Sequence, residues 1–172
     1  MNRFLTFLLI IITFSSYAQS PEGVSNKQWK NFLEAGAERK LDCKKININE
    51  LVKEAEKFLG VKHVMGGYSK KGIDCSGLVK FSFEKIGCTI EGRTAQDLAY
   101  YGRLQFNGYE LKKGDLVFFT GTYRTNNLIS HAGIVIGEGE FIHVSASKGV
   151  MKSNFLNGYW SDHFIFGTVV SH

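Results

Sequence analysis

Apolar residues recur at helical spacing in the first half of the chain. One helical face is marked by Ile48, Leu51, Val52, Ala55, Phe58 and Leu59. Asn47 or Asn49 is suited to cap the start of this helix, and Gly60 is suited to end it. Residues 61–68, which contain a glycine pair, are expected to be extended, and residues 94–102 are expected to form a further helix.

Another helix is predicted between Asp74 and Gly87, which suit the N-cap and the position just after a helix. Its inward face carries Leu78, Val79, Ser82 and Ile86. Cys75 lies in the first turn and shares this face. Free N–H groups and the positive end of the helix dipole favour thiolate over thiol there. Cys75 is therefore a candidate nucleophile, although a lone buried cysteine is usually a packing residue.

After Gly114 the apolar pattern changes from helical to strand spacing. Strands are predicted at 115–119, 132–136, 141–145 and 164–170, with 150–153 as a further candidate. A polar loop, residues 120–130, separates the first two strands. Because helices come first and strands second, the order indicates an α+β fold, with an antiparallel sheet packed on the Cys75 helix.

The N-terminal residues have the pattern of a secretory signal peptide, with cleavage expected after Ala18. Arg3 precedes an apolar run, residues 4–14, and small residues follow it. An uncleaved membrane anchor is the alternative, but this run is too short to span about 30 Å of hydrocarbon. The chain is thus divided into a signal peptide, residues 1–18, a polar lead with a short helix, residues 19–46, and a main domain, residues 47–172.

The composition fits one globular domain, since the 172 residues are 44% hydrophobic and 22% charged. Without Arg3, 20 basic residues stand against 16 acidic ones, a net charge of +4. This mild excess suits an anionic polymer such as cell wall, although a solvated surface explains it equally well. Basic residues are not interleaved with aromatic ones, so no nucleic-acid partner is expected. We expect an exported monomer, periplasmic or extracellular, with no membrane anchor after cleavage.

Three cysteines are an odd number for an oxidising compartment. If Cys75 is the reactive thiol, Cys43 and Cys88 remain as a possible disulfide. Two unpaired buried thiols are the alternative and the arrangement we expect, because sequence alone does not place two cysteines within bonding distance. The cysteines and the five histidines show no zinc-binding spacing, and the chain has no nucleotide-binding motif, so neither a metal nor another cofactor is expected.

A cysteine nucleophile needs a base, and the base needs an orienting partner. His131 opens one predicted strand and His143 lies on the next. A three-residue turn at 137–139 would pair His131 with Ser145 and place both histidines on one face, about 7–8 Å apart at Cα. A two-residue turn at 138–139 would place them on opposite faces. The three-residue turn is therefore predicted, although either histidine alone would be read as a half-buried strand residue.

Six blocks of sequence, in order and at matching spacing, closely resemble the NlpC/P60 family of cell-wall cysteine peptidases. They are GG at 66–67, DCSGLV at 74–79, RTAQ at 93–96, KGDLVFF at 113–119, SHAGIVIG at 130–137 and FIHVS at 141–145. The resemblance implies a papain-like α+β catalytic domain with the nucleophile at a helix N-terminus. By position, Cys75 matches the nucleophile, His131 the base and His143 the third polar residue. It also implies hydrolysis of peptidoglycan stem peptides, commonly between D-glutamate and the diamino acid.

His63 departs from the family pattern, which usually has a tyrosine at this position near the nucleophile. We expect His63, Asp74, Ser76 and Arg93 to contact the substrate, and His163 and His172 to lie at the surface. The family's frequent SH3-like wall-binding domain is not found in the chain, which favours an open groove and remodelling of intact wall. The alternatives are a non-catalytic wall-binding protein, an amidase or acyltransferase on the same fold, and an antibacterial effector.

Overall fold

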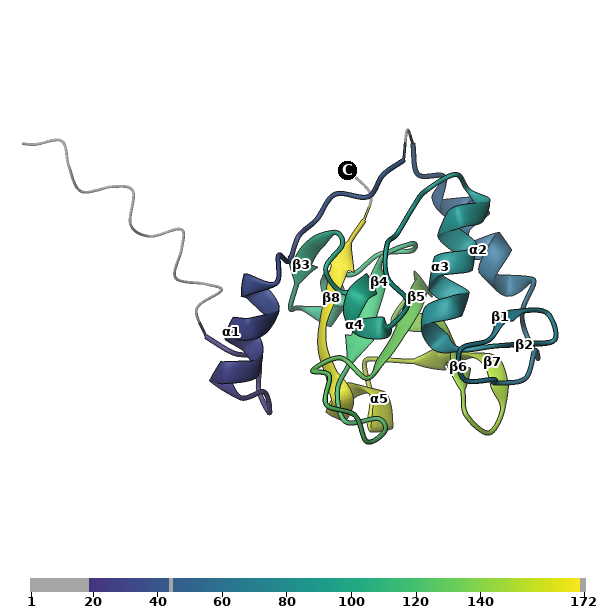
Figure 1. Ribbon diagram of the computed structural model, residues 1–172. Coiled ribbons are helices and arrows are strands. Elements are labelled where there is room, and N and C mark those ends of the chain that lie inside the picture. The colour runs from purple at the N-terminus through teal and green to yellow at the C-terminus, as the bar shows by residue number, and fades with distance from the viewer. Residues whose placement is uncertain (1–18, 44, 171–172) are drawn as a thin grey trace, which may run out of the picture.

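Figure 1 shows the protein as a computed structural model, which describes residues 19–43 and 45–170. The predicted signal peptide and His172 lie outside these residues. Among the helices that the structure describes, none is long and apolar enough to cross a membrane.

A six-stranded sheet forms the centre of the structure, and all neighbouring strands in it are antiparallel. In order across the sheet, the strands are β3 (Arg103–Gln105), β8 (Phe164–Val169), β4 (Leu116–Phe119), β5 (His131–Gly137), β6 (Glu140–Ser145) and β7 (Gly149–Asn154). The five strands expected from the sequence are confirmed, each within one residue of its predicted bounds. The edge strand β3 was not predicted, and neither was the small hairpin of β1 (Tyr68–Ser69) and β2 (Gly72–Ile73).

Two helices cover one side of the sheet, α2 (Ile48–Glu56) and α3 (Cys75–Lys85), and α3 packs directly on β5 and β6 (Figure 1). The predicted caps are confirmed: the side chains of Asn47 and Asp74 accept hydrogen bonds from the first turns of α2 and α3. Gly87 follows α3 with a φ of +77°, a conformation that favours glycine.

The helix expected at 94–102 is wrong in extent, because α4 (Ala95–Leu98) is a single turn. It begins as predicted at Thr94, which forms a capping box with Asp97. It ends early because Tyr101 pairs with Arg39 of the lead segment in a parallel bridge, which takes the backbone out of the helix.

The sheet has an apolar core on each face, because side chains alternate along its strands. On the face toward α3, Ala132 and Ile134 belong to the main core. On the opposite face, Val135 and Phe141 pack with residues of α5 (Gly158–His163), a short helix that was not predicted from the sequence. The alternation places His131 and His143 on this second face, beside Phe141 and Trp160.

The lead segment forms the predicted short helix, α1 (Asn26–Glu34), and joins the main core. The rings of Trp29 and Phe32 lie with their centroids 5.8 and 5.4 Å from that of Phe166 on β8. A 3-10 turn, η1 (Gly108–Glu110), lies after β3 and completes the elements that the structure describes. Residues 19–43 are thus packed against the remainder of the chain rather than separate from it.

Cys43 and Cys88 form a disulfide, with their Cα atoms 4.3 Å apart. The expectation of two unpaired thiols was therefore wrong. Asp42 and Thr89 pair in an antiparallel bridge, which brings the two cysteines beside each other across 45 residues of sequence. Sequence spacing does not predict this disulfide, because the disulfide joins the lead segment to the chain after α3.

Candidate functional site

The first turn of α3 is held by a network centred on Asp74, which is buried. Its Oδ1 accepts a hydrogen bond from the N–H of Gly77 at 2.7 Å, and its Oδ2 accepts one from the N–H of Gly66 at 2.8 Å. This single carboxylate therefore caps the helix and ties it to the glycine pair before it. Cys75, the next residue, is placed at the helix N-terminus as predicted.

Arg93 connects this network to the chain before α4. Its Nη1 donates to Asp74 Oδ1 at 2.9 Å, and its Nη2 donates to the carbonyl of Gly67 at 2.9 Å. Ser76 Oγ in turn donates to the carbonyl of Arg93 at 2.7 Å. Asp74, Ser76 and Arg93 were expected to contact substrate; they line the same cleft, but their polar groups are bonded mainly to one another.

His131 and His143 lie side by side on the neighbouring strands β5 and β6. Nε2 of His131 is 3.1 Å from Nδ1 of His143, and Nε2 of His143 is 3.0 Å from the hydroxyl of Ser153 on β7. The prediction that both histidines share one face is confirmed. Ser153 was missed, because a serine on a predicted strand carries no signal until its neighbour across the strands is known.

The turn between β5 and β6 differs from the prediction, although the register does not. Gly137 pairs with Glu140, so Glu138 and Gly139 form a two-residue turn. Farther along, Ile134 pairs with Ile142, which is the predicted register. The turn is one residue shorter than predicted, and a bulge at Ile136 on β5 compensates for that residue. The three-residue turn was therefore wrong, and the bulge is what keeps the two histidines on one face.

Aromatic rings enclose the histidine pair. Trp160 of α5 stacks on His131 with ring centroids 5.0 Å apart, and its ring lies 4.6 Å from that of His143. Phe141 stacks on the imidazole of His143, with ring centroids 4.5 Å apart. Gly133 makes room for Phe141, since a Cβ at this position would lie 2.4 Å from the Phe141 ring. His131 and His143 are consequently buried, with 7% and 1% of their surface exposed.

The acid–base properties of the site follow from this burial. Desolvation raises the pKa of the Cys75 thiol to about 11, and the charge of Asp74 adds to the increase. Backbone hydrogen bonds from Ala132 and Ser76 to the sulfur oppose it. Desolvation also lowers the pKa of His131 to about 3, with smaller contributions from His143 and His63, and lowers the pKa of His143 to about 4. Burial therefore favours the neutral thiol and the neutral imidazoles, and it opposes the helix N-terminus, which favours thiolate.

A cleft of about 550 Å³ brings the candidate residues together. Its lining includes Cys75, His131, His63, Tyr123 of the 120–130 loop and Trp160. His63 thus lies where it was expected, and its backbone pairs with Ile73 just before α3. His163 lies outside the lining and is half-buried, stacked on Tyr159 with ring centroids 4.2 Å apart. His143 also lies behind the cleft surface and reaches the cleft only through His131.

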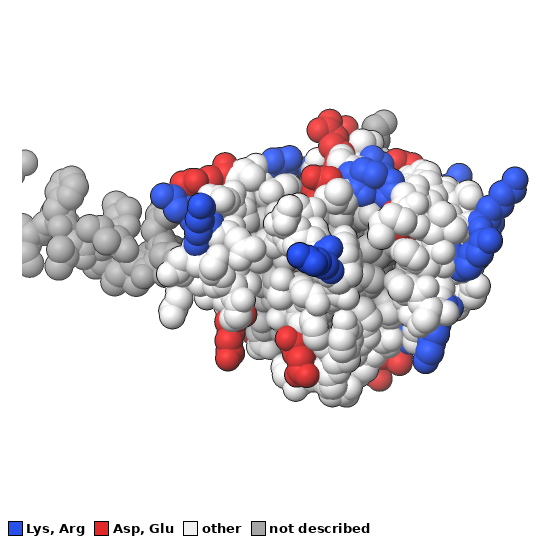
Figure 2. All heavy atoms as spheres, turned by 60° about the horizontal axis from the view of Figure 1, so that its bottom comes forward, with Lys and Arg blue, Asp and Glu red and all other residues white. Residues whose placement is uncertain are grey.

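The side of the molecule that carries α5 is largely uncharged. Figure 2 turns this side toward the viewer and shows charged side chains mainly at its margins. The mild positive charge of the chain is therefore not concentrated there. Within the described residues, no group of three or more histidine, cysteine, aspartate or glutamate side chains is arranged to hold a metal ion.

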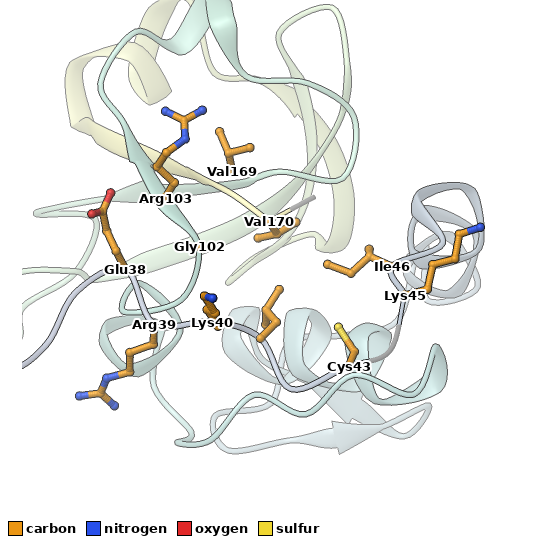
Figure 3. Close-up of a pocket in the computed structure, with 11 residues that line it drawn as sticks. Glu38, Arg39, Lys40, Cys43, Lys45, Ile46, Gly102, Arg103, Val169 and Val170 are labelled. Carbon is orange, nitrogen blue, oxygen red and sulfur yellow. The ribbon is translucent and has the colours of Figure 1, made fainter. Parts of the chain in front are cut away.

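A second hollow, of about 860 Å³, lies between the lead segment and the edge of the sheet (Figure 3). Leu41, Ile46 and Val170 contribute apolar surface to it. Figure 3 shows the charged ends of Arg39 and Lys45 pointing away from this hollow. Arg39 is also engaged elsewhere, since its guanidinium donates to the carbonyls of residues 35 and 36. The cleft at Cys75 is thus the better candidate for chemistry.

Comparison with known proteins agrees with this geometry. The model of the NlpC/P60 family matches residues 60–169. The chain belongs to the NlpC/P60 family. It is 40% identical over 121 residues to the bifunctional muramidase/DL-endopeptidase CwlT of Bacillus subtilis, a match that covers 69% of this chain and 36% of that protein.

Two further relatives support the family and its fold. The murein DD-endopeptidase MepS/murein LD-carboxypeptidase of Escherichia coli is 37% identical over 106 residues, covering 61% of this chain and 53% of that protein. A Staphylococcus aureus NLP/P60 family protein, described as similar to a lipoprotein, superimposes with a TM-score of 0.65 at 29% identity, covering 76% of this chain and 44% of that one. The papain-like α+β fold expected from the sequence is confirmed. The match nevertheless spans only 36% and 53% of the two curated relatives.

Proposed function

We propose that this chain is an exported cysteine endopeptidase that hydrolyses peptide bonds in peptidoglycan stem peptides. The observation that carries the proposal is that His131, whose ring nitrogen lies 3.1 Å from that of His143, lines the same cleft as a cysteine at a helix N-terminus. The curated relatives named above are DL- and DD-endopeptidases, and the chain shares their family.

In the proposed mechanism, Cys75 is the nucleophile and His131 the base. Nε2 of His131 is committed to His143, so Nδ1 is the nitrogen that receives the thiol proton. Because burial disfavours both charged forms, the proton moves as the sulfur attacks the scissile carbonyl, not before. The S–C bond forms while the carbonyl oxygen takes up negative charge beside the N–H of Cys75.

The same proton completes the cleavage. When the tetrahedral intermediate collapses, the C–N bond breaks and the protonated His131 gives its proton to the departing amine. Water then attacks the thioester, with His131 again as base, and releases the carboxylate and the thiol. His143 orients His131 through their hydrogen bond and is itself held by Ser153. None of these steps requires a metal or another cofactor.

The substrate proposed is the stem peptide, cut between D-glutamate and the diamino acid. Among the relatives, one name specifies a DL-endopeptidase and another a DD-endopeptidase, so the bond is what the experiment must decide. We propose that intact wall is remodelled by a groove that residues of the 120–130 loop and of α5 wall. Residues 47–172 would be the catalytic domain, with the lead segment packed onto it.

Mass spectrometry of muropeptides tests the proposal directly. Residues 19–172 are incubated with intact sacculi and, separately, with free tri- and tetrapeptides, and the new termini identify the bond. Cys75→Ala serves as the matched control. Products cut between D-glutamate and the diamino acid, formed faster from sacculi, are expected. Wild-type turnover by the Cys75→Ala variant would rule out the cysteine mechanism, and a strong preference for free peptides would rule out wall remodelling.

A non-catalytic wall-binding protein and an amidase or acyltransferase are the competing functions. The intact cysteine and paired histidines favour an enzyme over a binding protein. An acyltransferase would pass the acyl group from Cys75 to a nucleophile other than water, so its product would carry that acceptor in place of a free carboxylate. The same mass spectra distinguish the two outcomes.

A further inference from the structure

The loop between β4 and β5 is fixed at its neck beside the histidine pair. Ser130, the residue before His131, is buried. Its hydroxyl is 2.7 Å from that of Thr122 and accepts a hydrogen bond from the N–H of Thr122 at 3.0 Å. The N–H of Ser130 donates to the carbonyl of Phe119 at 2.8 Å. These contacts hold the start of the loop, and with it Tyr123, against the start of β5.

Tyr123 lines the cleft together with Cys75 and Asp74, and 49% of its surface is exposed. Partial burial raises the pKa of its phenol, and the nearby carboxylate of Asp74 and the sulfur of Cys75, when ionised, raise it further. The hydroxyl therefore keeps its proton over the working pH range, and its residue lines the same cleft as Cys75 at the start of α3.

The hydroxyl of Tyr123 differs from those of the tyrosines that support the fold. Tyr68 bonds to Glu84, Tyr101 accepts from the N–H of residue 91, and Tyr100 accepts from residue 96. Among residues 19–43 and 45–170, no hydrogen-bond partner is found for Tyr123 Oη. A protonated donor without a protein partner, held at the edge of a reactive site, is available to a bound substrate.

We propose that Tyr123 is a further catalytic residue, whose hydroxyl donates a hydrogen bond to the carbonyl oxygen of the acyl group that Cys75 attacks. The role rests on the proposed thiol chemistry of this site. As the S–C bond forms, the electron pair of the carbonyl π bond moves to oxygen, and the hydroxyl of Tyr123 and the N–H of Cys75 stabilise that oxygen. Tyr123 keeps its proton throughout, because the proton of the departing amine comes from His131.

An activated ester tests this role without any wall substrate. The rate of Cys75 acylation is measured from the burst of nitrophenolate released by p-nitrophenyl acetate, and alkylation by iodoacetamide is measured on the same proteins. In alkylation the sulfur attacks a saturated carbon and displaces iodide, so no oxyanion forms. Tyr123→Phe keeps the ring that walls the cleft and removes only the donor. Tyr109→Phe is the matched control, because this tyrosine is 79% exposed and outside the cleft lining.

Removal of one oxyanion donor is expected to slow acylation on the order of 10²-fold in Tyr123→Phe, with alkylation unchanged. With the muropeptide substrate, kcat should fall and KM should stay the same. Tyr109→Phe should match the wild type in all three assays. Unchanged acylation, a change confined to KM, or an equal loss of alkylation would each overturn the donor role. If the wild type cuts no muropeptide but its ester acylation still depends on Tyr123, the proposed function fails while this inference stands.

Discussion

His131 and His143 are joined by a hydrogen bond of 3.1 Å between Nε2 and Nδ1, across neighbouring strands. A His131 that can accept a proton at Nδ1 must carry its own proton on Nε2, which then donates to Nδ1 of His143. His143 in turn carries its proton on Nε2 and donates to the hydroxyl oxygen of Ser153, 3.0 Å away. This one bond therefore decides the tautomers of both imidazoles and makes the hydroxyl of Ser153 an acceptor.

The order of severity among substitutions follows from these roles. Cys75→Ala should abolish hydrolysis and leave the thermal melting temperature close to wild type, since the helix is held by its other apolar residues and by Asp74. His131→Ala should be nearly as severe and His143→Ala milder, because the latter orients the base without accepting the thiol proton. Steady-state rates on defined muropeptides measure the order. A His143→Ala variant that is less active than His131→Ala would contradict these assignments.

Ser153→Ala should lower kcat and leave KM unchanged. The substitution removes the acceptor of the His143 Nε2–H group. The tautomer of His143 that is protonated at Nε2, whose Nδ1 accepts the hydrogen bond from His131, is then populated less. The loss should be smaller than for His143→Ala, since the imidazole itself remains. Ser161→Ala on α5 is a suitable control, because its hydroxyl donates to the carbonyl of Gly158 within the same helix and not to either histidine. An increase in KM alone would show that Ser153 acts on substrate binding instead.

The folded protein should lose stability in mild acid because of its buried histidines. Their folded pKa values, about 3 for His131 and about 4 for His143, lie below the ordinary 6.5. The unfolded chain thus binds more protons in the window between these values, so stability is present above about pH 6.5 and is lost as pH falls toward the folded values. Each histidine should contribute a slope of about 1.4 kcal/mol per pH unit.

Urea unfolding between pH 7 and pH 4 measures this slope. His143→Gln should make the free energy of unfolding less dependent on pH, although it lowers its value at pH 7. His163→Gln is the control, since this histidine is only half-buried and lies outside the pair. An equal pH dependence in wild type and His143→Gln would show that other groups cause the acid sensitivity.

Reduction of the Cys43–Cys88 disulfide should destabilise the protein. The bridge closes a loop with a sequence separation of 45, for which chain entropy gives a stabilisation of about 4 kcal/mol. The paired variant Cys43→Ser/Cys88→Ser should melt at a lower temperature, and reductant should have no further effect on it. Activity well below the melting temperature should persist, because the disulfide is not part of the cleft lining. A wild-type melting temperature that reductant leaves unchanged would refute the stabilising role.

Much of the site could be predicted from local sequence because its parts are local. Asp74, Cys75 and Gly87 specify where α3 begins and ends through capping and φ preferences that need no distant partner. The strand register could also be predicted, since only one parity of pairing between these strands places His131 and His143 on the same face. The turn could not, because a bulge at Ile136 and a three-residue turn satisfy the same register.

The sequence by itself therefore determined the α+β order, the helix that presents Cys75, and the two histidines on one strand face. Only the tertiary structure decided what surrounds them. Trp160 stacks on His131 because α5, too short to be recognised by its periodicity, packs on the far face of the sheet. The same packing buries the two imidazoles, and this burial, which no local pattern encodes, lowers their pKa values.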